Sequence, residues 1–132
     1  MREQEHAGLT AYLRRNGMDQ GSQRSDGALV LIFDGQYRIY FRPAPKGALA
    51  LETRLLPLDP ERAAADRQLA LALDFAMSRI VAHAQALVLS GPGTALMLQQ
   101  VIGADADQAV VEGALEDFVN AVASWQSVMA TF

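Results

Sequence analysis

The stretch ALVLIFDGQYRIYFR, residues 28–42, places two largely apolar segments on either side of an Asp-Gly pair. A type I′ turn needs positive φ angles at both of its central residues, and Asp34-Gly35 suits that conformation. The stretch therefore predicts a β-hairpin with strands at residues 28–33 and 36–42. Because a hairpin pairs its strands antiparallel, we expect the sheet that contains it to be antiparallel.

A two-residue turn decides which side chains share a face of this hairpin. The first face would hold three apolar pairs, which we expect in the core: Ile32 with Tyr37, Val30 with Ile39, and Ala28 with Phe41. The second face would hold three mixed pairs: Phe33 with Gln36, Leu31 with Arg38, and Leu29 with Tyr40. This mixed face is either covered by the first helix or open to a partner.

Apolar spacing predicts the remaining elements. A helix over residues 2–16 carries Leu9, Tyr12 and Leu13 on one stripe. A third strand is expected at 48–56, a helix opened by Asp59-Pro60 at 59–82, strands at 86–89 and 95–102, and a last helix at 106–130 capped by Asp105. The fold class is therefore α+β, ordered helix–three strands–helix–two strands–helix, with helices packed on an antiparallel sheet.

The last two helices carry different apolar patterns. The last helix has one seam with alternating spacings of four and three, which we expect to be buried on the sheet: Val111, Leu115, Phe118, Val122, Trp125 and Met129. The middle helix is apolar nearly all round, which predicts burial on more than one side. Its second face either packs on its own sheet or forms a symmetric interface with another copy through Leu69, Leu73, Met77 and Ile80.

Composition excludes several function classes. The chain has 132 residues, is 51% apolar and carries a net charge of −4, which predicts one globular domain over residues 1–132. A sequence pI near 5.0 argues against nucleic-acid binding. Neither a secretory leader nor a run of about 20 apolar residues is visible, so we expect a cytoplasmic protein without membrane insertion.

No motif supports catalysis. His6, at an expected frayed start, and His83 both lack a second ligand at metal spacing. The Gly91–Thr94 segment lacks the Lys-Ser/Thr ending of a phosphate loop. Glu116 and Asp117 are adjacent on a helix, so they diverge and should face water. We therefore expect no catalytic residue, no metal site and no cofactor.

The order of elements, the length and the acidic pI, together with two segments, carry a resemblance to a known family. The segments are LIFDGQY, residues 31–37, and LEDFVNAVASW, residues 115–125. In them the chain resembles class I type III secretion chaperones of the Tir-chaperone (CesT-like) family. The resemblance implies a bacterial homodimer that binds the N-terminal chaperone-binding region of an effector protein. Such a chaperone keeps its effector soluble and ready for export without using ATP.

The mixed hairpin face is the expected effector site, with a bound strand adding to the sheet edge. The residues expected to bind effector are Leu9, Leu13, Leu29, Leu31, Phe33 and Tyr40. Arg38 and Arg42 either pair with effector carboxylates or lie in water. The alternative function is a small α+β regulatory or sequestering module, an anti-regulator built on the same fold.

Overall fold

A computed structural model describes residues 6–17, 22–23, 29–77, 85–90 and 93–130. Six strands form one antiparallel sheet in the order β1-β2-β3-β4-β6-β5. The strands are β1 (Ser22–Gln23), β2 (Leu29–Phe33), β3 (Tyr37–Pro43), β4 (Leu49–Pro57), β5 (Ala86–Leu89) and β6 (Ala95–Ile102). The helices are α1 (Ala7–Arg15), α2 (Arg62–Met77) and α3 (Gln108–Met129), with a short 3-10 turn at Pro45–Gly47. The predicted order is confirmed, with β1 as an addition.

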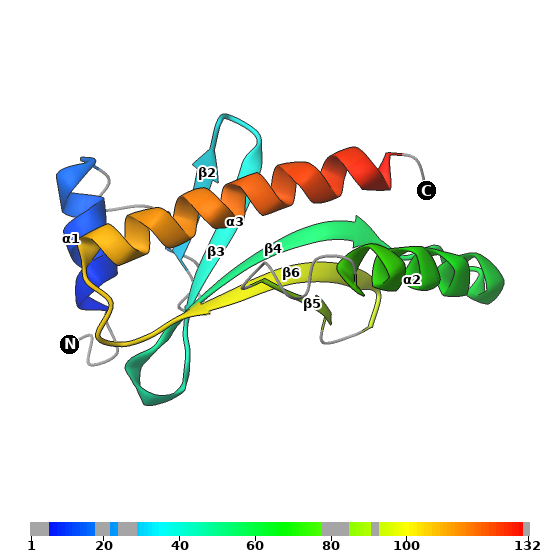
Figure 1. The fold of residues 1–132 in the computed structure, drawn as a ribbon, viewed down its shortest axis with the longest axis horizontal. Coiled ribbons are helices and arrows are strands. Elements are labelled where there is room, and N and C mark those ends of the chain that lie inside the picture. The colour runs from blue at the N-terminus through cyan, green and yellow to red at the C-terminus, as the bar shows by residue number, and fades with distance from the viewer. Residues whose placement is uncertain (1–5, 18–21, 24–28, 78–84, 91–92, 131–132) are drawn as a thin grey trace.

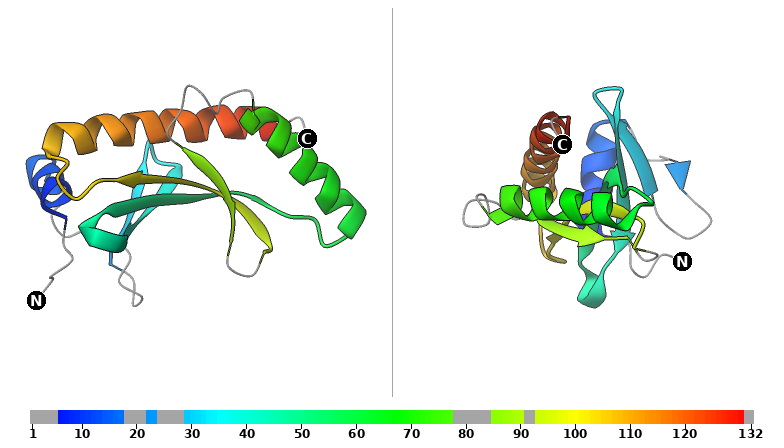
Figure 2. Two further views of the ribbon diagram at one scale, coloured as in Figure 1. Left: turned by 60° about the horizontal axis from the view of Figure 1, so that its bottom comes forward. Right: turned by 90° about the vertical axis from the view of Figure 1, so that its right-hand side faces the viewer.

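The helices are distributed unevenly over the sheet (Figure 1). Helix α3 runs across one face and contacts β4 and β6, while α1 packs beside its N-terminal end. Helix α2 lies at the opposite end and projects beyond the strands, as Figure 2 shows from two sides. Helices therefore cover one face of the sheet, and none of the described helices covers the other.

The predicted seam of α3 is confirmed. Val111, Leu115, Phe118, Val122 and Trp125 are all buried, and Met129 is half-buried. Glu116 and Asp117 face water as expected. The predicted cap is wrong by two residues, because Asp107, and not Asp105, accepts the hydrogen bond from the Val110 amide at 3.0 Å.

His6 is an anchor and not a frayed end. Its side chain is 4% exposed, its Nδ1 accepts from the Leu9 amide at 3.1 Å, and its Nε2 lies 2.7 Å from the Gly103 carbonyl oxygen. The ring thus caps α1 and ties it to the segment that follows β6. Close packing at Gly8 completes this contact, since a Cβ there would collide with the Ala106 carbonyl oxygen.

Helix α2 begins three residues later than predicted. The Glu61 carbonyl accepts the first helical bond from the Ala65 amide at 2.9 Å, and Asp59 Oδ1 accepts from the Glu61 amide at 2.9 Å. Asp59 therefore forms a local turn ahead of the helix instead of capping it. The predicted end of this helix near Ala82, along with Ile80 and His83, lies outside the described residues.

The hairpin has the predicted turn but a different register. Asp34 and Gly35 have φ angles of 54° and 70°, and the Gln36 amide donates to the Phe33 carbonyl at 3.0 Å. Strand pairing nevertheless starts at Phe33↔Tyr37, so Gln36 is an extra unpaired residue. The predicted pairs are wrong by one position, and the observed pairs include Leu31↔Ile39 and Ile32↔Arg38.

This one-residue shift exchanges the two faces of β2, because side chains alternate along a strand. Leu31 is 8% exposed and shares the helix-covered face with Ile39 and Phe41. Ile32, expected in the core, is 59% exposed beside Arg38. The mixed face predicted for Leu29, Leu31 and Phe33 therefore does not exist.

The register predicts opposite outcomes for two adjacent substitutions. Leu31→Ala should lower the free energy of unfolding by about 2–5 kcal/mol, since it empties a buried leucine site. Ile32→Ala, a matched control on the exposed face, should change it by less than about 0.5 kcal/mol. Urea titrations followed by circular dichroism measure both values. Equal losses, or a larger loss at Ile32, would contradict the register.

Candidate protein-binding surfaces

The most exposed apolar surface belongs to α2 and the neighbouring strand β5. Leu73 and Met77 on α2 are 58% and 69% exposed, and Leu89 on β5 is 52% exposed. Ala72 is the only fully buried residue that α2 contributes among those described. Large apolar side chains gathered in this way are typical of a protein-protein contact.

A hollow of about 330 Å³ lies beneath this surface. Leu73 and Met77 of α2 form one wall, and Trp125 of α3 and Leu98 of β6 contribute to the other side. Trp125 is 5% exposed and packs edge-on against Phe75, with ring centroids 4.7 Å apart. This aromatic pair joins α2 to α3 beside the hollow.

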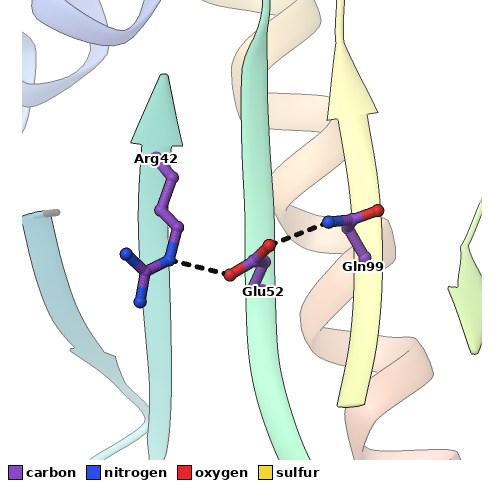
Figure 3. Close-up of polar contacts among 3 residues, drawn as sticks. All are labelled: Arg42, Glu52 and Gln99. Carbon is purple, nitrogen blue, oxygen red and sulfur yellow. Dashed lines mark hydrogen bonds and ion pairs between the residues drawn. The ribbon is translucent and has the colours of Figure 1, made fainter. Parts of the chain in front are cut away.

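The open face of the sheet carries a polar network across three strands (Figure 3). Glu52 on β4 accepts from Arg42 Nε on β3 and from Gln99 Nε2 on β6, both at 2.8 Å. Helix α3 lies behind the strands in this view, so the network is on the face that α3 leaves open. The Arg42 guanidinium also lies 5.8 Å from the centroid of the Tyr40 ring.

A second hollow of about 500 Å³ lies between α1, α3 and the hairpin turn. Its lining includes Tyr12, Phe33, Asp34, Glu112 and Glu116. Burial raises the pKa of the Tyr12 hydroxyl, and the negative charges of Glu112 and Glu116 raise it further. This hollow is acidic, whereas the open sheet face carries exposed arginines, so the two surfaces suit partners of opposite charge.

The six residues expected to bind effector are not brought together. Leu9 and Leu13 on α1 and Leu31 on β2 are core residues, and Leu29 and Phe33 pack partly buried against the same core. Tyr40 lies on the opposite face in a row with Glu52 and Gln99. The expected alternative, in which α1 and the core cover that face of β2, is the arrangement observed.

Three of the four residues expected at a dimer interface are placed by the structure. Leu69 is half-buried, Leu73 and Met77 are exposed, and Ile80 lies outside the described residues. Sequence reasoning missed the exposed Leu89 on β5 and Arg54 on β4, whereas it named Arg38 and Arg42 as candidate partners of effector carboxylates. Leu89 could have been found from the sequence, because it is an apolar residue at the end of the short strand that follows α2 in the chain.

The described residues show neither a metal-binding cluster nor a membrane-spanning helix. The described residues contain no group of three or more His, Asp or Glu side chains that could hold a metal ion. Among the helices of the described ranges, none combines the length and apolar run needed to cross a bilayer. An α+β domain with an exposed apolar helix and an open sheet face has the make-up of a protein-binding module.

The comparison with family models agrees with this class. Residues 9–126 match the model of the Tir chaperone protein (CesT) family, so the chain belongs to that family. This confirms the resemblance noted in the sequence. A search of curated protein sequences found no significant match.

Solved structures confirm the fold. The chain is similar to one in the ExsC–ExsE complex, with 20% identity and a TM-score of 0.63, over 90% of this chain and 88% of that chain. It is also similar to the Yersinia pestis type III secretion chaperone SycH in complex with a fragment of YscM2, with 12% identity and a TM-score of 0.59, over 89% and 95%. A third similar structure is the HopA1–SchA chaperone–effector complex, with 15% identity and a TM-score of 0.67, over 91% of each chain.

The environment of Tyr12 predicts a loss of stability in alkali. Because the pKa of Tyr12 is raised on folding, the folded chain holds this proton more tightly than the unfolded chain does. The resulting stabilisation is complete below the unfolded value of about 10 and is lost as pH rises through the folded value.

Urea midpoints measured between about pH 9 and pH 11 should therefore fall more steeply for the wild type than for Tyr12→Phe. Tyr40→Phe is the matched control, since it removes a tyrosine hydroxyl that does not line this hollow, and its pH slope should follow the wild type. Identical pH slopes for the wild type and Tyr12→Phe would contradict this interpretation of the hollow.

Proposed function

We propose that the chain is a homodimeric, cytoplasmic type III secretion chaperone. In this proposal it binds the N-terminal segment of a secreted effector in extended form and keeps it soluble and competent for export. The exposed apolar surface of α2 and β5 is the observation that carries the proposal, in a chain that belongs to a chaperone family. Binding proceeds by surface complementarity, so the protein acts as a non-enzymatic partner without nucleotide, metal or other cofactor.

The dimer contact is assigned to Leu69, Leu73, Met77 and Ile80, with Leu89 added from β5. Specific interfaces bury about 1,600 Å² in total, and buried apolar area contributes about 25 cal/mol per Å² before association costs. Leu73 and Met77 are exposed and also line the apolar hollow, so a second copy of α2 that packs on them gains contact with the hollow as well as with the helix. In a symmetric dimer each of these residues contributes buried area from both copies.

The client is assigned to surfaces that one chain leaves open. Tyr40 stays in the effector-binding set, and Val30 and Ile32 join it because the observed register places them on the same open face. Leu9, Leu13, Leu29, Leu31 and Phe33 support this face from the core. Strand addition at the β5 edge of the sheet gives a second route for an extended segment.

The dimer assignment predicts that Leu73→Asp yields a monomer or an aggregate. A buried, unpaired carboxylate at the centre of an apolar contact is strongly unfavourable. Light scattering should give twice the 14.3 kDa chain mass for the wild type at micromolar concentration.

Leu71→Asp is the matched control for this experiment. Leu71 is also exposed on α2, at 47%, but two residues along a helix turn it about 200° away from Leu73. Its dimer mass should be unchanged. A monomeric wild type, or a dimer that survives Leu73→Asp, would show that α2 does not form the contact.

The chaperone assignment predicts that a partner recovered from the native bacterium by affinity capture is a secreted protein. A fragment of about 50 residues from the partner's N-terminus spans about 165–180 Å when extended, long enough to wrap a small dimer. Isothermal calorimetry should give this fragment the affinity of the full partner, with no added nucleotide.

Two results would overturn the chaperone assignment. The first is a partner whose folded domain binds while its N-terminal fragment does not. The second is a partner that stays in the cell and regulates gene expression, which would favour the sequestering module instead.

A further inference from the structure

The sheet splits between β3 and β4. Their ladder runs only from Tyr40↔Glu52 to Pro43↔Leu49. Toward the hairpin turn, residues 37–39 pair with β2 alone, and Thr53–Pro57 of β4 pair with β6 alone. Figure 1 shows the β2–β3 hairpin diverging from β4. The Thr53 hydroxyl donates to the Arg38 carbonyl at 2.8 Å, so a side chain closes the point where the ladder ends.

A hollow of about 530 Å³ occupies this split. It reaches both faces of the sheet, because Tyr37 and Thr53 lie on the α3 side and Arg38 and Arg54 lie on the open side. Its lining residues are Gln36, Tyr37, Arg38, Tyr40, Arg42, Thr53, Arg54, Met97 and Gln126. Because β4 continues along this hollow without a partner on the β3 side, the split has the geometry of an edge open to strand addition.

The hollow is positively charged in an acidic protein. Among the described residues, three arginines and no carboxylate line it, although the whole chain carries a net charge of −4. Glu52 on β4 forms an ion pair with Arg42, and the Arg42 guanidinium lies over the Tyr40 ring. Arg38 and Arg54 are exposed on either side of the split. Charge complementarity therefore selects a partner segment with carboxylates.

We propose that the split between β3 and β4 binds an extended acidic segment of the client. The segment runs beside residues 54–57 of β4, beyond the hydrogen bond between Thr53 and Arg38, and its carboxylates meet Arg38 and Arg54. These four residues correspond to about 13 Å of bound strand. This inference rests on the proposed chaperone function and assigns that function a site and a charge preference. The apolar α2 surface remains the contact between the two copies.

The test uses a fluorescein-labelled peptide of about ten alternating Thr and Glu residues, which is long enough to span the free part of β4. Its Thr-Gln counterpart is the uncharged control. Fluorescence anisotropy should show that the Thr-Glu peptide binds at least about tenfold more tightly at low salt and loses this advantage at high salt. The double variant Arg38→Glu/Arg54→Glu should weaken binding of the Thr-Glu peptide by about tenfold or more.

The matched control is Arg14→Glu/Arg62→Glu, which makes the same charge change at two exposed positions outside the hollow. Its affinity for the Thr-Glu peptide should stay within about twofold of the wild type. Equal binding of the two peptides, or unchanged binding by Arg38→Glu/Arg54→Glu, overturns the proposal. Loss of the dimer in that double variant also overturns it, because a second copy would then occupy the split.

The same variants separate this inference from the proposed function. If the client's N-terminal fragment binds the wild type and Arg38→Glu/Arg54→Glu equally well, the chaperone function stands and the site in the split is wrong. If no effector fragment binds the wild type while the Thr-Glu peptide does, the acidic-strand site stands and the chaperone function fails.

Discussion

The packing of the α3 seam on the sheet is the contact on which the rest of the structure depends. Phe118 and Val122 have no exposed surface, and the helix contacts α1 as well as β4 and β6. Removing an aromatic side chain from such a site costs about 3–5 kcal/mol, a large part of a domain's stability. This packing closes one face, and the largest exposed apolar side chains of α2 and the arginines of β3 and β4 lie away from it.

Most elements were predictable because local rules and tertiary packing agree. The strands at 86–89 and 95–102 have the predicted bounds, and the α3 seam is buried as its spacing indicates. The hairpin shows the limit of that reasoning. Asp34-Gly35 forms the expected turn, but Gln36 stays unpaired, and a one-residue shift is enough to bury Leu31 and expose Ile32.

The features missed from sequence depend on contacts between distant segments. The burial of His6 follows from Gly103, which lies 97 residues along the chain. The length of the β3–β4 ladder follows from how the two strands diverge, which no local pattern encodes. The residues expected to bind effector do not form one open face for a physical reason: the observed register places Leu29, Leu31 and Phe33 against the core.

The chain carries two kinds of surface in different places. Apolar side chains gather on α2 and β5, while arginines border the split between β3 and β4. An apolar surface suits a permanent contact between copies, and a charged hollow with an unpaired strand suits a segment that must be released for export. Belonging to a chaperone family is consistent with this division of roles.

Amide hydrogen exchange of the protein, with and without the N-terminal fragment of a captured partner, tests the proposed placement of the client most directly. Exchange should slow in residues 37–42 of β3 and 53–56 of β4 and stay unchanged in α3, whose apolar seam is already buried. Slowing confined to α1 and α3, with none in β3 or β4, would place the bound segment on the helix-covered side of the sheet and rule out the split as its site.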